Sequence, residues 1–251
     1  MAYRELLRPD THVTCLWIRD AAPVAREHRV LPDACVDVVW NGERLRVAGP
    51  ATGPVMATVP AGAAAMGVRF RVGAAGAALG LPAAELLDST VALEDLWGRE
   101  SERIADRVAA AAPGAPQLAA LAHAVGERIA RGGEPDAVVR AAATGTRRSA
   151  LGIGDRQLRR RFADAVGYGP KTLERVLRFQ RFLLLAARDA APDLARLALE
   201  AGYADQAHLT RESSRLAGLP PAALLASGAG PAGDRSVSFK TRASDCASMA
   251  A

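Results

Sequence analysis

Short stretches in which apolar and polar residues alternate occupy the first third of the chain. They are rich in valine and are separated by proline, glycine, asparagine and aspartate, which is typical of β-strands joined by turns. The stretches cover residues 12–18, 35–40, 44–48 and 66–70. Residues 82–85 and 93–97 are typical of short helical turns. The pattern predicts a β-rich sensory domain over residues 1–98, for which a cupin-like barrel is one candidate form.

After residue 98 the apolar residues recur at helical spacing. This predicts two helices that form a connector over residues 99–131. The sequence Arg131-Gly-Gly-Glu-Pro135 breaks the second helix and marks a domain boundary. An all-helical domain is expected over residues 137–226. Residues 227–251 hold almost no large apolar side chain and are expected to form a disordered tail.

A helix with one apolar and one cationic face is predicted from Asp155 onward. At 100° per residue, Leu158 and Phe162 share one face, whereas Arg156 and Arg160 point the opposite way. A glycine-containing turn precedes this helix. Such a helix fits the major groove of DNA, where arginine binds guanine O6 and N7 or grips phosphates.

A second helix-turn-helix pattern lies between residues 194 and 221. A short scaffold helix meets Gly202, and Asp205 is placed to cap a second helix whose core side carries Leu209. The outward side offers short or polar groups that can approach base edges and backbone. They are Gln206, Ala207, Thr210, Arg211 and Ser214. Gln206 and Arg211 are the residues that we expect to read bases.

One continuous helix over residues 170–188 is predicted to join the two patterns. Pro170 stands in its first turn, and an apolar stripe runs along it. The stripe consists of Leu173, Val176, Leu177, Leu183, Leu184 and Ala187. Nineteen residues make about 28 Å of helix, and one face of DNA recurs every ~34 Å. A spacer of that order can place two recognition helices in adjacent segments of the major groove.

Positive charge is concentrated in this helical part of the chain. Residues 140–216 hold 15 Lys and Arg against 8 Asp and Glu, a net charge of +7, whereas residues 1–139 hold 14 against 17, a net charge of −3. A segment of this kind favours a polyanionic partner. The composition, 50% hydrophobic and 24% charged over 251 residues, is typical of a folded protein with two small domains. No run approaches about 18 apolar residues, the start is not signal-like, and the cysteines are scattered, so we expect a cytoplasmic protein.

Residues of about 136–226 resemble the C-terminal DNA-binding domain of AraC-type regulators. The motifs that carry the resemblance are Arg156-Gln-Leu-Arg-Arg-Arg-Phe162, Gly169-Pro170, Arg178-Phe179 and Gly202-Tyr-Ala-Asp-Gln-Ala-His-Leu-Thr-Arg211. The resemblance implies two helix-turn-helix subdomains joined by a helix. It also implies base or phosphate contacts by Arg156, Arg159, Arg160, Gln206, Thr210 and Arg211. The overall expectation is an α+β protein of two domains.

The N-terminal part is similar to an uncharacterised domain that accompanies such regulators. The motifs are residues 31–40, 48–50 and 67–70. The resemblance implies a one-component regulator that binds a double-stranded DNA operator under the control of a signal at this domain. The effector, the operator, the direction of regulation, a homodimer and a contact with RNA polymerase stay open.

The sequence departs from the family pattern at three places. Gly154 stands where a Ser or Thr cap is usual, with Asp155 as a substitute one residue later. The segment between Val138 and Leu151 is too short for the two scaffold helices that normally precede the first recognition helix. Ser213 and the residue after it replace an aromatic core residue and a basic one.

The polar residues of the β-rich domain allow two interpretations. Cys15 and Cys35 are interpreted as core residues, with a thiol sensor as the alternative. Asp33 is interpreted as a turn residue, and Asp37 and Arg69 as residues on the solvent-exposed face of a sheet, with a ligand pocket as the alternative. The histidines show no metal-ligand spacing, so we expect no metal and no cofactor.

Two other functions stay open beside DNA binding with signal control. One is a DNA-modifying enzyme with Cys35 as the nucleophile, although nothing that flanks Cys35 supplies a base. The other is a degenerate regulator that acts through protein contacts only. The chain has no Gly-x-Ser-x-Gly, no phosphate-binding loop and no His-Glu-x-x-His motif, so we expect it not to be an enzyme.

Overall fold

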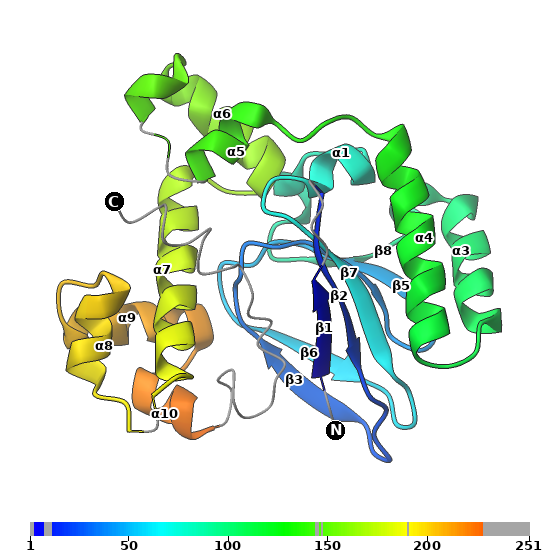
Figure 1. Ribbon diagram of the computed structural model, residues 1–251, viewed down its shortest axis with the longest axis horizontal. Coiled ribbons are helices and arrows are strands. Elements are labelled where there is room, and N and C mark those ends of the chain that lie inside the picture. The colour runs from blue at the N-terminus through cyan, green and yellow to red at the C-terminus, as the bar shows by residue number, and fades with distance from the viewer. Residues whose placement is uncertain (1–2, 8–11, 144–145, 147, 190, 228–251) are drawn as a thin grey trace.

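The computed structural model describes residues 3–7, 12–143, 146, 148–189 and 191–227. Its N-terminal half contains an antiparallel sheet of six strands in the order β1-β2-β7-β4-β5-β8. A separate ribbon pairs β3 with β6 (Figure 1). The strands are β1 (Tyr3–Leu7), β2 (Val13–Arg19), β3 (Arg26–Val30), β4 (Asp37–Trp40), β5 (Leu45–Ala48), β6 (Val55–Val59), β7 (Ala65–Phe70) and β8 (Thr90–Ala92). The large sheet is open, with β1 and β8 at its edges, and does not form a cupin-like barrel.

One face of the large sheet is apolar and is covered by helices. Alternate residues of the strands, such as Val38 and Val68, point into a core that they share with α1 (Ala75–Leu79), α3 (Arg99–Ala110) and α4 (Ala115–Arg131). The two helices that we expected to connect the domains therefore cover the sheet. Two short elements, η1 (Ala83–Leu86) and α2 (Glu94–Trp97), confirm the predicted helical turns.

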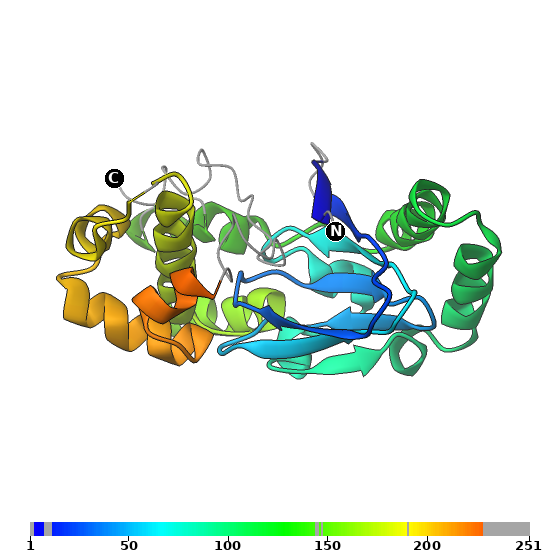
Figure 2. The ribbon, with the colours of Figure 1, turned by 90° about the horizontal axis from the view of Figure 1, so that it is seen from below.

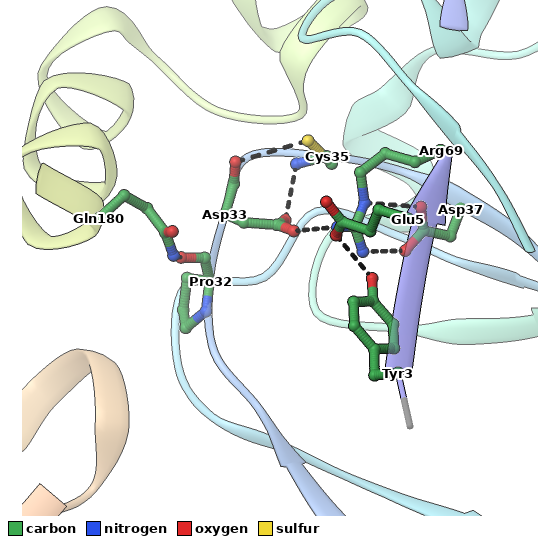
Figure 3. Close-up of polar contacts among 8 residues, drawn as sticks. All are labelled: Tyr3, Glu5, Pro32, Asp33, Cys35, Asp37, Arg69 and Gln180. Carbon is green, nitrogen blue, oxygen red and sulfur yellow. Dashed lines mark hydrogen bonds and ion pairs between the residues drawn. The ribbon is translucent and has the colours of Figure 1, made fainter. Parts of the chain in front are cut away.

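The opposite face of the sheet holds a buried cluster of charges (Figure 3). Arg69 is only 6% exposed, and its guanidinium donates to both carboxylate oxygens of Asp37 at 2.9 and 2.6 Å. Asp33 and Glu5 lie 3.5 and 3.8 Å from the same side chain. The expected position of Asp37 and Arg69 on an exposed face is therefore wrong. The physical reason is β1, which the sequence pattern did not reveal and which brings Glu5 and Tyr3 over this face.

The C-terminal half is helical and is built around one central helix. Its elements are α5 (Ala137–Ala143), η2 (Arg148–Leu151), α6 (Asp155–Val166), α7 (Pro170–Ala186), α8 (Leu194–Ala201), α9 (Gln206–Ala217) and α10 (Pro221–Ala226). The predicted joining helix is confirmed as α7, and its stripe residues Leu173, Val176 and Leu183 are buried. The expected disordered tail lies outside the described residues from 228 onward. The fold class expected from the sequence, α+β with two domains, is confirmed.

The two halves of the chain share their second hydrophobic core. Leu31 and Ala34, in the segment between β3 and β4, are buried in the same cluster as the helices α5 to α10. The Gln180 side-chain amide of α7 donates a hydrogen bond to the Pro32 carbonyl (Figure 3). Figure 2 shows the result as a row, with the C-terminal helices at one end, the strands in the middle and α3 and α4 at the other end. No helix among the described residues is long and apolar enough to cross a membrane.

Candidate nucleic-acid interface

The helix α6 has the two faces that the sequence predicted. It begins after Gly154, which offers no side-chain cap, and it ends at Gly167, whose φ of +93° is a left-handed conformation that glycine adopts readily. Leu158 and Phe162 are buried in the second core. Arg156, Arg159 and Arg160 are all exposed. The core thus fixes the helix by one face and leaves a cationic face in solvent.

The arginines of α6 differ in what they contact. Arg161 is half-buried and pairs with both carboxylate oxygens of Asp136 at 3.2 Å, which ties α6 to the residue before α5. The Nε of Arg159 donates to the carbonyl of Asp155 in its own helix at 3.3 Å. Arg156 and Arg160 have no hydrogen bond or ion pair with any residue that the structure describes. These two side chains are therefore available to an external anion.

The second pattern forms a capped helix-turn-helix unit. Asp193 accepts hydrogen bonds from the amides of Ala195 and Arg196 and so caps α8. Gly202 ends α8 with a φ of +92°. The Asp205 carboxylate accepts from the His208 amide at 2.6 Å and caps α9. The sequence signals for this turn, a glycine followed by an acidic cap, were sufficient to predict where α8 ends and where α9 begins.

The exposed face of α9 carries the residues expected to read DNA. Gln206 and Arg211 are exposed, and Thr210 is half-buried with its hydroxyl donating to the Gln206 carbonyl at 2.9 Å. His208 lies edge-on to the Tyr203 ring with centroids 5.2 Å apart, so its ring packs within the unit. The candidate reading positions therefore lie in the N-terminal half of α9, as they do in α6.

Ser213 lies on the core side of α9 in place of a large aromatic residue. It is fully buried, and its hydroxyl donates a hydrogen bond of 2.8 Å to the Leu219 carbonyl beyond the end of the helix. The buried hydroxyl is thus satisfied and holds the turn between α9 and α10. The departure from the family pattern at this position is accommodated by a local hydrogen bond.

Two arginines of α7 that sequence reasoning did not single out as site residues brace the second unit. The Arg175 guanidinium makes two hydrogen bonds of 2.8 Å to the Glu212 carboxylate on α9. These bonds hold the pKa of Glu212 below its usual value. One turn further along α7, Arg178 lies 5.5 Å over the Tyr203 ring in the turn before α9. Their spacing of three residues on one helix face was the only sequence signal for this role.

The joining helix holds the two candidate recognition helices in a fixed arrangement. In Figure 1, α6 lies near one end of α7, and α8 and α9 lie beside its other half. Both units pack on α7 through the second hydrophobic core. A helix of 17 residues is about 25 Å long, so the two cationic surfaces are held apart by a rigid element.

Residues 149–227 match a family described as a helix-turn-helix domain. The C-terminal half carries an AraC-type DNA-binding domain. Residues 9–92 match a family described as a domain of unknown function, DUF6597, so the chain combines that domain with the AraC-type one. The resemblance drawn from the sequence motifs is thereby confirmed. Comparisons with curated proteins and with solved structures gave no match.

The N-terminal domain offers little support for nucleophilic chemistry at Cys35. Burial, followed by the charge of Asp33, raises the pKa of the Cys35 thiol well above its usual value. Burial likewise raises the pKa of Cys15 to about 12. A thiolate is the reactive form of cysteine, so both thiols are poor nucleophiles at neutral pH. Within the described residues, no group of His, Cys, Asp and Glu is arranged to hold a metal ion.

Proposed function

We propose that this protein regulates transcription by binding a double-stranded DNA operator through α6 and α9, under the control of a signal received by its N-terminal domain. In this proposal Arg156 and Arg160 contact bases or phosphates in one major-groove segment, with Arg159 on the adjacent backbone. Gln206 and Arg211 read a second segment, and Thr210 lies beside them.

The observation that carries the proposal is the free cationic surface at the start of each recognition helix. Arg160 and Arg211 are exposed and have no ionic partner among the residues described, whereas Arg161 and Arg175 are engaged in internal pairs. Arginines that stabilise a fold are usually paired or packed. Those left free on a helix that is held rigidly by a core are suited to bidentate contacts with guanine and to phosphate.

The control function of the N-terminal domain is supported by how closely this domain adjoins the DNA-binding one. Leu31 and Ala34 are buried among the C-terminal helices, and Asp33, between them, lies in the buried charge cluster. A change at that cluster would be transmitted directly to the core around α7.

The test is a mobility-shift titration with the operator recovered from genomic fragments that the wild-type protein captures. Arg160→Ala and Arg211→Ala are each expected to weaken binding by roughly 5- to 150-fold, the equivalent of about 1–3 kcal/mol for a lost base contact. Arg103→Ala, which removes an exposed arginine from α3, is the matched control and should bind as the wild type does.

Salt dependence separates the two kinds of contact. A variant that loses a phosphate contact reduces the slope of log Kobs against log salt by about 1, whereas one that loses a base contact relaxes sequence preference. Unchanged binding in both variants would contradict the assigned faces. Absence of any sequence-selective binding by the wild type would favour a regulator that acts through protein contacts only.

A further inference from the structure

The two helix-turn-helix units are supported differently. In the second unit, α8 precedes α9 and packs against it, with Gly202 in the turn between them. In the first unit, the described residues between α5 and α6 contain only the single turn η2. Within the part of its own domain that the structure describes, α6 is therefore supported by α5 and by this single turn, without a helix directly before it as α8 stands before α9.

The N-terminal domain adds further support to α6. The end of α6 packs against η1 and α1. A Cβ atom placed on Gly167 would lie 2.5 Å from the Pro50 ring and 3.1 Å from the Ala83 carbonyl oxygen, so the backbones approach as closely as glycine allows. A Cβ on Gly73 would lie 3.8 Å from the Cβ of Ala165. Together, Pro50, Gly73 and Ala83 form a docking surface for the end of α6, which we call the seat.

The close approaches to these glycines are made by the C-terminal end of α6. They involve Asp164, Ala165, Val166 and Gly167. Arg160 lies about one turn and Arg156 about two turns before Asp164, in the exposed half. The α9 helix is held in the same way, because the Arg29 guanidinium donates to the Ala217 carbonyl, and Pro54 lies against Gly218. The N-terminal domain thus contacts both recognition helices at their C-terminal ends, and the arginines in their N-terminal halves stay exposed.

We propose that the N-terminal domain completes the first helix-turn-helix unit, with α1, η1 and Pro50 acting as the scaffold that positions α6 on DNA. The docked arrangement is then the DNA-binding form of the protein, and the N-terminal domain is a structural part of the DNA reader. The inference rests on the proposed function, because it specifies how α6 is positioned to contact the operator.

The first experiment introduces a larger side chain, a wedge, into the seat in the full chain. A Cβ on Gly76 of α1 would lie 3.1 Å from the Leu81 carbonyl oxygen and 3.5 Å from the Asp164 carbonyl oxygen, so a larger side chain there displaces the end of α6. Gly76→Leu is compared with Gly126→Leu, a helical glycine of α4 that has open space around it. Hydroxyl-radical footprints are recorded on the DNA selected by the wild type, and cooperative thermal unfolding checks that each variant is folded.

In the Gly76→Leu variant, the DNA segment bound by α6 is expected to lose its protection from hydroxyl radicals, whereas the segment bound by α9 should stay protected. Affinity should fall by roughly tenfold or more, the equivalent of about one lost base contact. The control variant should give the wild-type footprint. A folded Gly76→Leu variant that protects both segments overturns the inference while leaving the proposed function intact. A wild type that protects no DNA overturns the proposed function itself.

The second experiment locks the seat and does not depend on the wedge variant being folded. The Cβ separation of 3.8 Å between Gly73 and Ala165 matches that of a disulfide. DNA binding by the double variant Gly73→Cys, Ala165→Cys is measured in the oxidised and in the reduced protein. The reduced protein is the control for backbone strain caused by the substitution at Gly73, whose φ is +81°. The oxidised protein should bind with the same footprint as the reduced one. Loss of binding on oxidation, restored by reduction, overturns the inference because α6 would then have to leave the seat to bind DNA.

Discussion

The guanidinium of Arg29 donates a hydrogen bond of 2.7 Å to the backbone carbonyl oxygen of Ala217. Arg29 belongs to β3, and Ala217 is the last residue of α9, so a strand of one domain caps a helix of the other. A cation at a helix C-terminus interacts favourably with the helix dipole and satisfies a carbonyl that has no partner within the helix.

Replacement of Arg29 should destabilise the docked domains. Arg29→Met keeps much of the side-chain length and removes the charge, and it is expected to lower the free energy of unfolding by about 0.5–1.5 kcal/mol. Arg29→Lys should recover part of that loss, because the charge remains. Urea unfolding followed by circular dichroism measures both. Equal stability of the Met and Lys variants would show that the charge at this helix end has no effect.

The Arg175 and Glu212 pair predicts a pH dependence of stability. The folded pKa of Glu212 is lowered by its hydrogen bonds to Arg175. The pair therefore stabilises the fold above the unfolded pKa of about 4.3, and this contribution is lost as the pH falls through the folded pKa. Glu212→Gln is expected to cost roughly 1 kcal/mol at neutral pH, a value limited by solvent screening. The difference from the wild type should shrink below about pH 4. Unfolding titrations at several pH values test this, and a constant difference would contradict it.

Replacement of Ser213 by a smaller or by a larger residue should destabilise the fold. Ser213→Ala leaves the carbonyl of the half-buried Leu219 without its donor and is expected to cost about 1 kcal/mol. Ser213→Phe inserts a ring where the serine is fully buried and is expected to cost about 1–3 kcal/mol through overpacking. Ser214→Ala, at the exposed neighbouring position, is the control. A phenylalanine variant as stable as the wild type would mean that the core around α9 has room for an aromatic residue.

The buried charge cluster of the N-terminal domain should depend strongly on its arginine. Arg69→Met leaves Asp37 and its acidic neighbours buried without their cation, and it is expected to cost about 3–5 kcal/mol. Arg4→Ala removes an ion pair with Asp20 in which the arginine side chain is 61% exposed, and it should cost less than about 1 kcal/mol. Denaturant midpoints of the two variants provide the comparison, and similar midpoints would contradict the burial of the cluster.

The C-terminal domain could be predicted from the sequence in most of its detail. The apolar stripe of α7 and the Gly202 and Asp205 signals place α7, α8 and α9, because local periodicity and caps determine where these elements begin and end. The positions of Arg156 and Arg160 on the exposed face of α6 follow from the helical repeat alone. The bracing of the second unit by Arg175 depends on a contact with a residue 37 positions away, and the spacing of Arg175 and Arg178 on one helix face does not specify that partner.

The N-terminal domain could be predicted only in outline. Strand β3 was missed because Arg26–Val30 carries charged residues and has no regular alternation, and its pairing partner β6 was missed with it. Strand β1 was missed for the same reason, and with it the burial of Arg69. Whether a charged strand residue faces solvent depends on which strand pairs beside it, and pairing between distant segments is not encoded in local periodicity.

The adjacent residues Pro32 and Asp33 connect the helix α7 to the buried charge cluster. The Pro32 carbonyl is bound by α7 through Gln180, and the Asp33 carboxylate faces Arg69 from the other side of the same segment. A displacement of Asp33 moves the peptide unit that Gln180 holds, without any intervening linker. In the proposed function, a signal that acts on the charge cluster would reach α7 through this single segment.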